Sequence, residues 1–113
     1  MNDKFLSLLG MARRSGRVSL GHDAVIGSVI RNKAKLCILS EEASERLKKE
    51  ITHACNYENK NIPVLIAHYD MLTLSSAVGS KAAVVSVDDE GFANKILSLY
   101  GEAVTPDKTE GKE

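Results

Sequence analysis

The segment from residue 12 to residue 35 has the residue types that bind a polyanion. It contains six basic residues and one acidic residue, in a chain whose formal net charge at pH 7 is zero. The basic residues are Arg13, Arg14, Arg17, Arg31, Lys33 and Lys35. Gly21 opens an amphipathic run in this segment, and a glycine at the start of a helix lets another molecule approach free N–H groups. Because basic side chains neutralise phosphates, the segment predicts a nucleic-acid site, and RNA is the partner that we expect.

Charge is unevenly distributed along the chain. Residues 1–60 contain 11 Lys and Arg and 7 Asp and Glu, whereas residues 61–113 contain 4 and 8. Such asymmetry is typical of a neutral protein with one basic face. Lys48 and Lys49 are mixed with Glu45 and Glu50, so we interpret that stretch as an ordinary solvated helix face.

Gly16 and Gly21 have the spacing of a phosphate-binding P-loop. A functional P-loop continues with Lys and then Ser or Thr, which reach the phosphates and the magnesium ion. Here His22 and Asp23 follow instead, and a carboxylate beside a triphosphate is repulsive. The segment therefore does not predict nucleotide hydrolysis.

Catalytic and metal-binding chemistry find little support in the sequence. His22 and Asp23 could act as an acid–base pair, but no nucleophile is placed near them, and catalysis needs that geometry. The alternative, which we favour, is that Asp23 caps a helix and His22 is simply exposed. His53 and His68 stand singly, without metal-ligand spacing. We predict no enzymatic activity, no metal and no cofactor.

Cysteine usage and hydropathy predict a cytoplasmic protein with no membrane association. Cys37 lies in an apolar run and Cys55 on a predicted helix, with no CxxC motif, so both are expected to be free and buried. No apolar run approaches the roughly 20 residues that span a bilayer. The N-terminal arginines follow the apolar stretch, which is the reverse of a secretory signal.

Helices and strands alternate along the chain. Helical spacing predicts helices over residues 3–14, 23–31, 41–57 and 71–78, and a last helix that begins after residue 88. Extended or apolar runs predict strands over residues 17–19, 34–40, 62–67 and 82–87. This order predicts a single-domain, three-layer α/β/α sandwich with a small mixed sheet over residues 1–101. Residues 102–113 lack apolar periodicity and are expected to form a disordered acidic tail.

The same patterns assign faces and ends to the helices. The apolar residues expected to point inward are Val25, Ile26, Val29 and Ile30 on the second helix, and Phe92, Ile96, Leu99 and Tyr100 on the last. Asp70 is expected to cap the fourth helix and Gly79 to end it. Asp88, Asp89 and Glu90 would complement the dipole at the start of the last helix.

Four segments resemble the kink-turn RNA-binding ribosomal-protein superfamily of the L-seven-Ae type, and look closest to its small bacterial branch. They are ARRSGRVSLGHDAVIGSVIRNKAKLCILSEEAS, NIPV, LTLSSAVGSKAAVVSV and FANKILSL. The similarity extends from about Phe5 to Leu99.

The resemblance implies an α/β/α sandwich that binds kink-turns, which are sharply bent RNA internal loops closed by tandem sheared G·A pairs. In that superfamily the start of the second helix and the loop after the fourth helix grip the RNA. By position these are Gly21, His22 and Asp23, and Ser80, Lys81 and Ala82. Arg17 falls where members carry a basic residue that touches the RNA backbone.

The sequence departs from the superfamily pattern at the residues that read bases. Members carry an Asn-Glu pair and then a Lys, and the corresponding residues here are Asp23, Ala24 and Gly27. Asp23 can still accept hydrogen bonds from guanine, whereas Ala24 and Gly27 have no polar side chain. The second loop also lacks the bulky apolar residue that is usual there.

We therefore predict a non-enzymatic protein that recognises structured, kink-turn-like RNA and is associated with the ribosome or translation. Ribosomal RNA is a candidate partner, and we expect a monomer. The predicted RNA-contacting residues are Arg13, Arg14, Arg17, Gly21, His22, Asp23, Arg31, Lys33, Ser80, Lys81 and Ala82. The alternative is a protein–protein adaptor on the same fold with weak or lost specific RNA binding.

Overall fold

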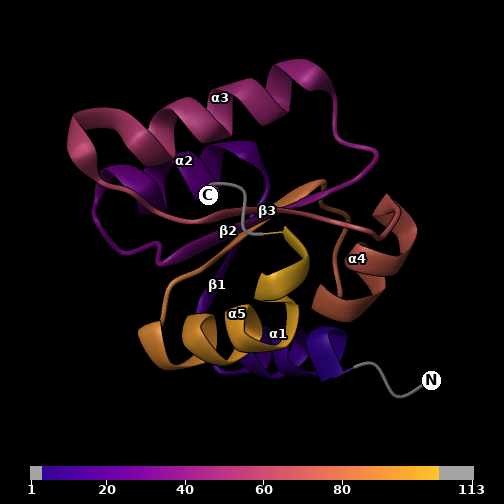
Figure 1. Ribbon diagram of the computed structural model, residues 1–113. Coiled ribbons are helices and arrows are strands. Elements are labelled where there is room, and N and C mark those ends of the chain that lie inside the picture. Colours follow the sequence, from indigo (N-terminus) through magenta and orange to yellow (C-terminus); the bar gives the residue numbers. More distant parts are fainter. Residues whose placement is uncertain (1–3, 105–113) are drawn as a thin grey trace.

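A four-stranded mixed sheet forms the middle layer of the structure, a computed structural model that describes residues 4–104 (Figure 1). The strands are β1 (Val18–Leu20), β2 (Leu36–Ser40), β3 (Val64–Ala67) and β4 (Val84–Val87), in the spatial order β1-β4-β2-β3. β4 runs antiparallel to both of its neighbours, and β2 and β3 are parallel. The predicted mixed sheet is confirmed.

Helices cover both faces of this sheet (Figure 1). One layer contains α1 (Lys4–Arg14), α4 (Met71–Val78) and α5 (Glu90–Val104), and the other contains α2 (His22–Ile30) and α3 (Glu45–Asn56), which continues into the short η1 (Tyr57–Asn59). Two apolar clusters fill the spaces between the layers. Leu36 and Ile38 of β2 belong to the cluster under α1, α4 and α5, whereas Cys37 and Leu39 belong to the cluster under α2 and α3. The three-layer sandwich is therefore confirmed.

Burial along the strands follows their place in the sheet. Every residue of β2 and β4 is buried, as expected of strands that are covered on both faces. The unbroken apolar run over residues 62–67 predicts a buried strand as well, but β3 forms an edge of the sheet, and Ile66 on it is 39% exposed. The apolar run IPVLIA could not show which strand would lie at the edge.

Helix ends are set by local capping. Ser44 begins α3, because its hydroxyl accepts a hydrogen bond from the Leu47 N–H at 3.0 Å, so this helix starts later than the predicted residue 41. Asp70 caps α4 as predicted, and its carboxylate accepts from the Thr73 N–H at 2.8 Å. Hydrogen bonds from the backbone and side chain of Thr73 lower the pKa of this carboxyl. Gly79 ends α4 in the left-handed conformation, with φ of 77°.

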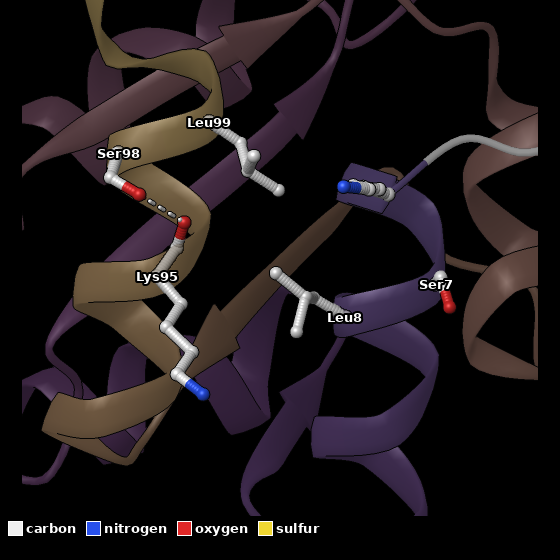
Figure 2. A pocket seen from close by; sticks show the side chains of 6 residues that line it. Ser7, Leu8, Lys95, Ser98 and Leu99 are labelled. Atoms are coloured by element: carbon white, nitrogen blue, oxygen red, sulfur yellow. Dashed lines mark hydrogen bonds between the residues drawn. The ribbon is translucent and has the colours of Figure 1, made fainter.

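Two apolar residues predicted to be buried are exposed. Ile30 is 65% exposed and is the last residue of α2. Leu99 is 48% exposed, and it lines a hollow of about 330 Å³ between α1 and α5. Figure 2 shows the side chains of Leu8 and Leu99 pointing into this space from the two helices. The predicted partner Tyr100 lies outside the residues whose side chains are described.

The C-terminal boundary also differs from the expectation. α5 continues through Val104, so the first residues of the predicted tail are helical. The remainder of that tail, residues 105–113, lies outside the described residues. No helix in the described part of the chain has the length and apolar character needed to cross a membrane.

Both cysteines are free and fully buried, as predicted, and the fold brings them together between β2 and α3. The sulfur atoms of Cys37 and Cys55 lie 3.4 Å apart. The hydrogen bond with Cys55, and then burial, raise the pKa of the Cys37 thiol. Their separation of 18 residues gave no indication of this contact, which depends on how α3 crosses the sheet.

Candidate nucleic-acid interface

The two connections that the sequence predicted to bind RNA meet at one edge of the sheet. The Gly21 N–H donates to the Val84 carbonyl at 2.9 Å, which holds the start of α2 against the start of β4. The chain enters β4 directly from the connection after α4, so that connection lies at the same edge. This surface lies at one end of the strands and is not formed by an edge strand. We call it the loop edge and define it by residues 21–23 and 80–82.

Gly21 occupies the N-cap position of α2 with φ of 87° and ψ of 166°. This backbone region is essentially restricted to glycine. A Cβ built there would meet no atom within 4 Å, so the space beside it is open. No side chain caps the helix. The first N–H groups of α2 therefore remain available to an anion, and the helix dipole adds positive potential.

The interpretation of Asp23 as the cap of α2 is wrong. Its carboxylate is fully exposed, and the N-cap residue is Gly21, two positions earlier. His22 is not simply exposed either, because its ring is held between two carboxylates. Its Nδ1 lies 3.2 Å from Asp23 Oδ1, and its Nε2 lies 3.0 Å from Glu50 Oε1 on α3. The ring thus links the start of α2 to α3, a contact that the sequence could not indicate.

The connection after α4 offers fewer side chains for contact with RNA than the sequence predicted. Ala82 is only 4% exposed, and its N–H donates to the Ser75 hydroxyl at 3.0 Å, so its side chain cannot reach a ligand. Ser80 and Lys81 are exposed. Both also line a hollow of about 680 Å³ that extends along α4 to Leu72, which is 76% exposed. The loop edge therefore combines a hydroxyl, an ammonium group and a neighbouring apolar surface.

Most of the predicted basic residues lie at the opposite edge of the sheet. The Asp88 N–H donates to the Arg17 carbonyl, and the Lys35 N–H donates to the Val87 carbonyl, both at 2.8 Å. These contacts are at the end of β4, whereas Gly21 contacts its beginning. A strand of this length spans roughly 10 Å. In Figure 1, α4 lies at the right, near the loop edge, and the chain passes from α2 to β2 at the opposite side.

We call this second surface the basic edge. It is defined by Arg13, Arg17, Lys33, Lys35 and Lys60, which come from the end of α1, the start of β1, the connection from α2 to β2 and the segment before β3. Lys60 was not predicted, because it is 25 residues from Lys35 in the sequence. It joins the others because β2 and β3 are parallel, which places their starts side by side.

The side chains of Arg14 and Arg31 turn away from the basic edge. A Cβ placed at Gly27 would lie 3.0 Å from Arg31 Nη1, so this guanidinium group folds back over α2 by one turn. Similarly, Arg14 Nη1 would lie 3.4 Å from a Cβ at Gly10. The single basic cluster predicted from the sequence is therefore divided into separate groups by the fold.

Asp88 has a structural role that the sequence did not reveal. Its carboxylate accepts hydrogen bonds from the hydroxyls of Ser19 and Ser28 at 2.7 Å and of Ser86 at 2.8 Å. These serines lie on β1, α2 and β4, so the network fixes α2 against the sheet. Ser28 and Ser86 are completely buried. Asp89, by contrast, acts as predicted at the start of α5, where its carboxylate accepts from the Phe92 N–H at 2.9 Å.

Removal of the Asp88 carboxylate is expected to destabilise the protein strongly. Asp88→Ala leaves two buried hydroxyls without their acceptor, so we expect a loss of about 2–4 kcal/mol in the free energy of unfolding. Asp89→Ala is the matched control and should cost about 1 kcal/mol, because it removes only a helix cap. Urea denaturation measures both values. Equal losses in the two variants would contradict the role of Asp88.

The described residues contain no group of three or more His, Cys, Asp or Glu side chains that could hold a metal ion. The chemistry that the two edges offer consists instead of open N–H groups, exposed cations and hydroxyls. These groups bind anions and polar edges.

Known proteins similar to this chain cover almost all of it. A family model described as "Ribosomal protein L7Ae/L30e/S12e/Gadd45 family" matches residues 3–97. The RNA-binding protein YlxQ of Bacillus subtilis (strain 168) is 38% identical over 97 residues, which are 85% of this chain and 94% of that protein. A solved protein of unknown function from Bacillus halodurans has a TM-score of 0.82 at 32% identity, covering 88% of this chain and 99% of its own.

A more distant solved structure shows the same fold. The Giardia lamblia 15.5kD RNA binding protein has a TM-score of 0.69 at 20% identity, over 90% of this chain and 89% of its own. Together with the family match, this confirms the resemblance that the four sequence segments indicated.

Proposed function

The chain belongs to the ribosomal protein L7Ae/L30e/S12e/Gadd45 family, and we propose that it is a non-enzymatic RNA-binding protein that recognises structured, kink-turn-like RNA. The observation that carries this proposal is the meeting of two connections at the loop edge, one opening at Gly21 and the other ending at Ala82. The name of the Bacillus subtilis relative, RNA-binding protein YlxQ, supports an RNA partner.

Backbone phosphates fit the start of α2. Gly21 places no side chain in the space before the first helical N–H groups, and a phosphate oxygen can accept from them directly. Lys81 on the second connection supplies a positive charge at the same edge. Such contacts fix the position of the RNA but do not read its sequence.

Base-edge contacts at the loop edge are limited to few side chains. The exposed Asp23 carboxylate can accept hydrogen bonds from guanine N–H donors, and the Ser80 hydroxyl can donate or accept. Ala24 and Gly27 add none. We therefore propose that the bent shape of the RNA backbone, more than base identity, determines recognition.

We further propose that the protein is a cytoplasmic monomer that acts with the ribosome or the translation machinery, with ribosomal RNA as its candidate partner. The ribosomal-protein family to which the chain belongs supports this setting.

Titration with two RNA hairpins tests the proposal. One hairpin contains a kink-turn, and the other is fully paired and of equal length. At about 150 mM salt, where surface charges are screened beyond about 8 Å, we expect the kink-turn hairpin to bind at least about tenfold more tightly. Fluorescence anisotropy measures both affinities. Equal affinities would contradict kink-turn recognition, and no binding to either RNA would favour the protein–protein adaptor.

A further inference from the structure

The basic edge lies across the sheet from the loop edge, and we propose that it binds the phosphodiester backbone of a second RNA segment. This inference rests on the proposed function and deepens it. The protein would then hold two RNA segments at once, one on each edge.

A cleft in the basic edge has the size and lining for a backbone phosphate. Its volume is about 240 Å³, and it lies between the connection from α2 to β2 and the segment before β3. Its lining residues are Asn32, Ala34, Lys35, Lys60, Asn61, Ile62 and Pro63. Two ammonium groups and two side-chain amides therefore surround one hollow, and all four can donate hydrogen bonds to phosphate oxygens.

The geometry around Asn32 keeps these donors in place. Lys60 Nζ donates to Asn32 Oδ1, so the amide oxygen is occupied and the Nδ2 group remains free to donate. Asn32 and Asn61 adopt left-handed backbone conformations, with φ of 62° and 54°. Asparagine tolerates this region better than most residues. Both turns thus bring an amide to the cleft at a modest conformational cost.

The end of α2 does not repel an anion as an open helix end would. The orphan carbonyls at a helix C-terminus carry partial negative charge. Here the Asn32 N–H donates to the Val29 carbonyl at 3.0 Å, and the Lys33 N–H donates to the Ser28 carbonyl at 2.9 Å. Those carbonyls are therefore satisfied within the turn itself.

The cations of the basic edge are not neutralised by the protein. None of its five basic side chains forms an ion pair with another residue in the range 4–104, whereas on α3 Arg46 pairs with Glu50 and Lys48 with Glu45. The Asp88 carboxylate, which lies at this edge, is occupied by its three serine hydroxyls. The other acidic residues of the adjoining elements are Glu58, Asp89 and Glu90, and within residues 4–104 none of them forms an ion pair with these cations. The five cations therefore remain available to a polyanion.

The two edges are separate contact surfaces. The length of β4, roughly 10 Å, separates their backbones, and they lie at opposite ends of the strands, so one phosphate group cannot contact both. The described molecule has extents of 34 × 29 × 27 Å, and the body of the sheet lies between the two edges. A single protein can thus fix the relative position of two parts of a folded RNA.

Neutralisation of three lysines of the basic edge, two of which line the cleft, tests this inference. The variant is Lys33→Gln/Lys35→Gln/Lys60→Gln, and the probes are a fully paired RNA duplex and a single-stranded RNA of equal length. We expect affinity for at least one probe to fall at least about tenfold, and the slope of log affinity against log salt to decrease by about 2–3. Affinity for a short kink-turn hairpin should change by less than about threefold. Lys48→Gln/Lys49→Gln on α3 is the matched control and should leave all of these values unchanged.

A bridging assay adds an independent readout. Wild-type protein is mixed with a fluorescent kink-turn hairpin and with the immobilised probe, duplex or single strand, whose affinity the triple variant loses. We expect the hairpin to be captured only when protein with an intact cleft is present. Unchanged affinity of the Lys33→Gln/Lys35→Gln/Lys60→Gln variant for both probes would overturn the inference. Loss of kink-turn binding in parallel with duplex binding would also overturn it, because it would indicate one shared surface. Wild-type protein that binds no RNA at all would refute the proposed function itself.

Discussion

Substitution of Gly21 by valine is expected to lower the affinity for a kink-turn hairpin at least about tenfold while the fold persists. The backbone of Gly21 lies in a region that costs other residues about 1–3 kcal/mol, so some stability will be lost. The larger effect should be on binding, because the branched side chain would occupy the open space before the first N–H groups of α2. Each hydrogen bond to a charged phosphate contributes about 1.5–3 kcal/mol.

Gly16→Val separates backbone strain from RNA contact. Gly16 also has a positive φ, of 76°, and a Cβ there also meets nothing within 4 Å, but it lies in the turn before β1 and away from the loop edge. We expect it to lose comparable stability in thermal denaturation and to retain affinity for the kink-turn hairpin within about threefold. A folded Gly21→Val protein that binds this RNA as wild type does would show that Gly21 serves only the turn.

The order and type of the elements could be predicted because each has a local cause. Continuous apolar runs produced β2 and β4, helical spacing produced α1 and α3, and Asp70 with Gly79 delimited α4. Strand order could not be predicted in this way, since it depends on which faces pack together. For that reason the sequence did not indicate that β3 lies at an edge.

The same distinction between local features and contacts of distant segments applies to the candidate site. Gly21 was identified because its conformational freedom at a helix start is a local property, and the structure places it there. The basic residues were grouped because they are close in sequence, but β1 and β4 carry Arg17 to the edge opposite Gly21. Lys60 joins that edge through parallel strand pairing, which has no local signal. Contacts between distant segments therefore account for what the sequence could not show.

Restoration of the superfamily's base-reading residues is expected to increase kink-turn preference. The variant is Asp23→Asn/Ala24→Glu/Gly27→Lys, and each good base-edge contact contributes roughly 1–3 kcal/mol of discrimination. We therefore expect the ratio of kink-turn to duplex affinity to rise by about 10–100-fold. A Cβ at residue 27 meets only the guanidinium end of Arg31, a flexible group that can move. It should also favour α2, since glycine costs about 0.8–1.0 kcal/mol relative to alanine in a helix.

Gly27→Lys alone distinguishes base reading from added charge. Its lysine increases the positive potential of α2 without providing the Asn-Glu pair, so we expect affinity for the kink-turn hairpin and the paired hairpin to rise by similar factors. In the complete variant only the kink-turn should gain beyond that factor, because its open base edges are available to Asn and Glu side chains. Anisotropy titrations of both proteins against both hairpins give the four affinities needed. If the folded triple variant shows no greater preference than Gly27→Lys, the residues assigned to base reading by position are the wrong ones.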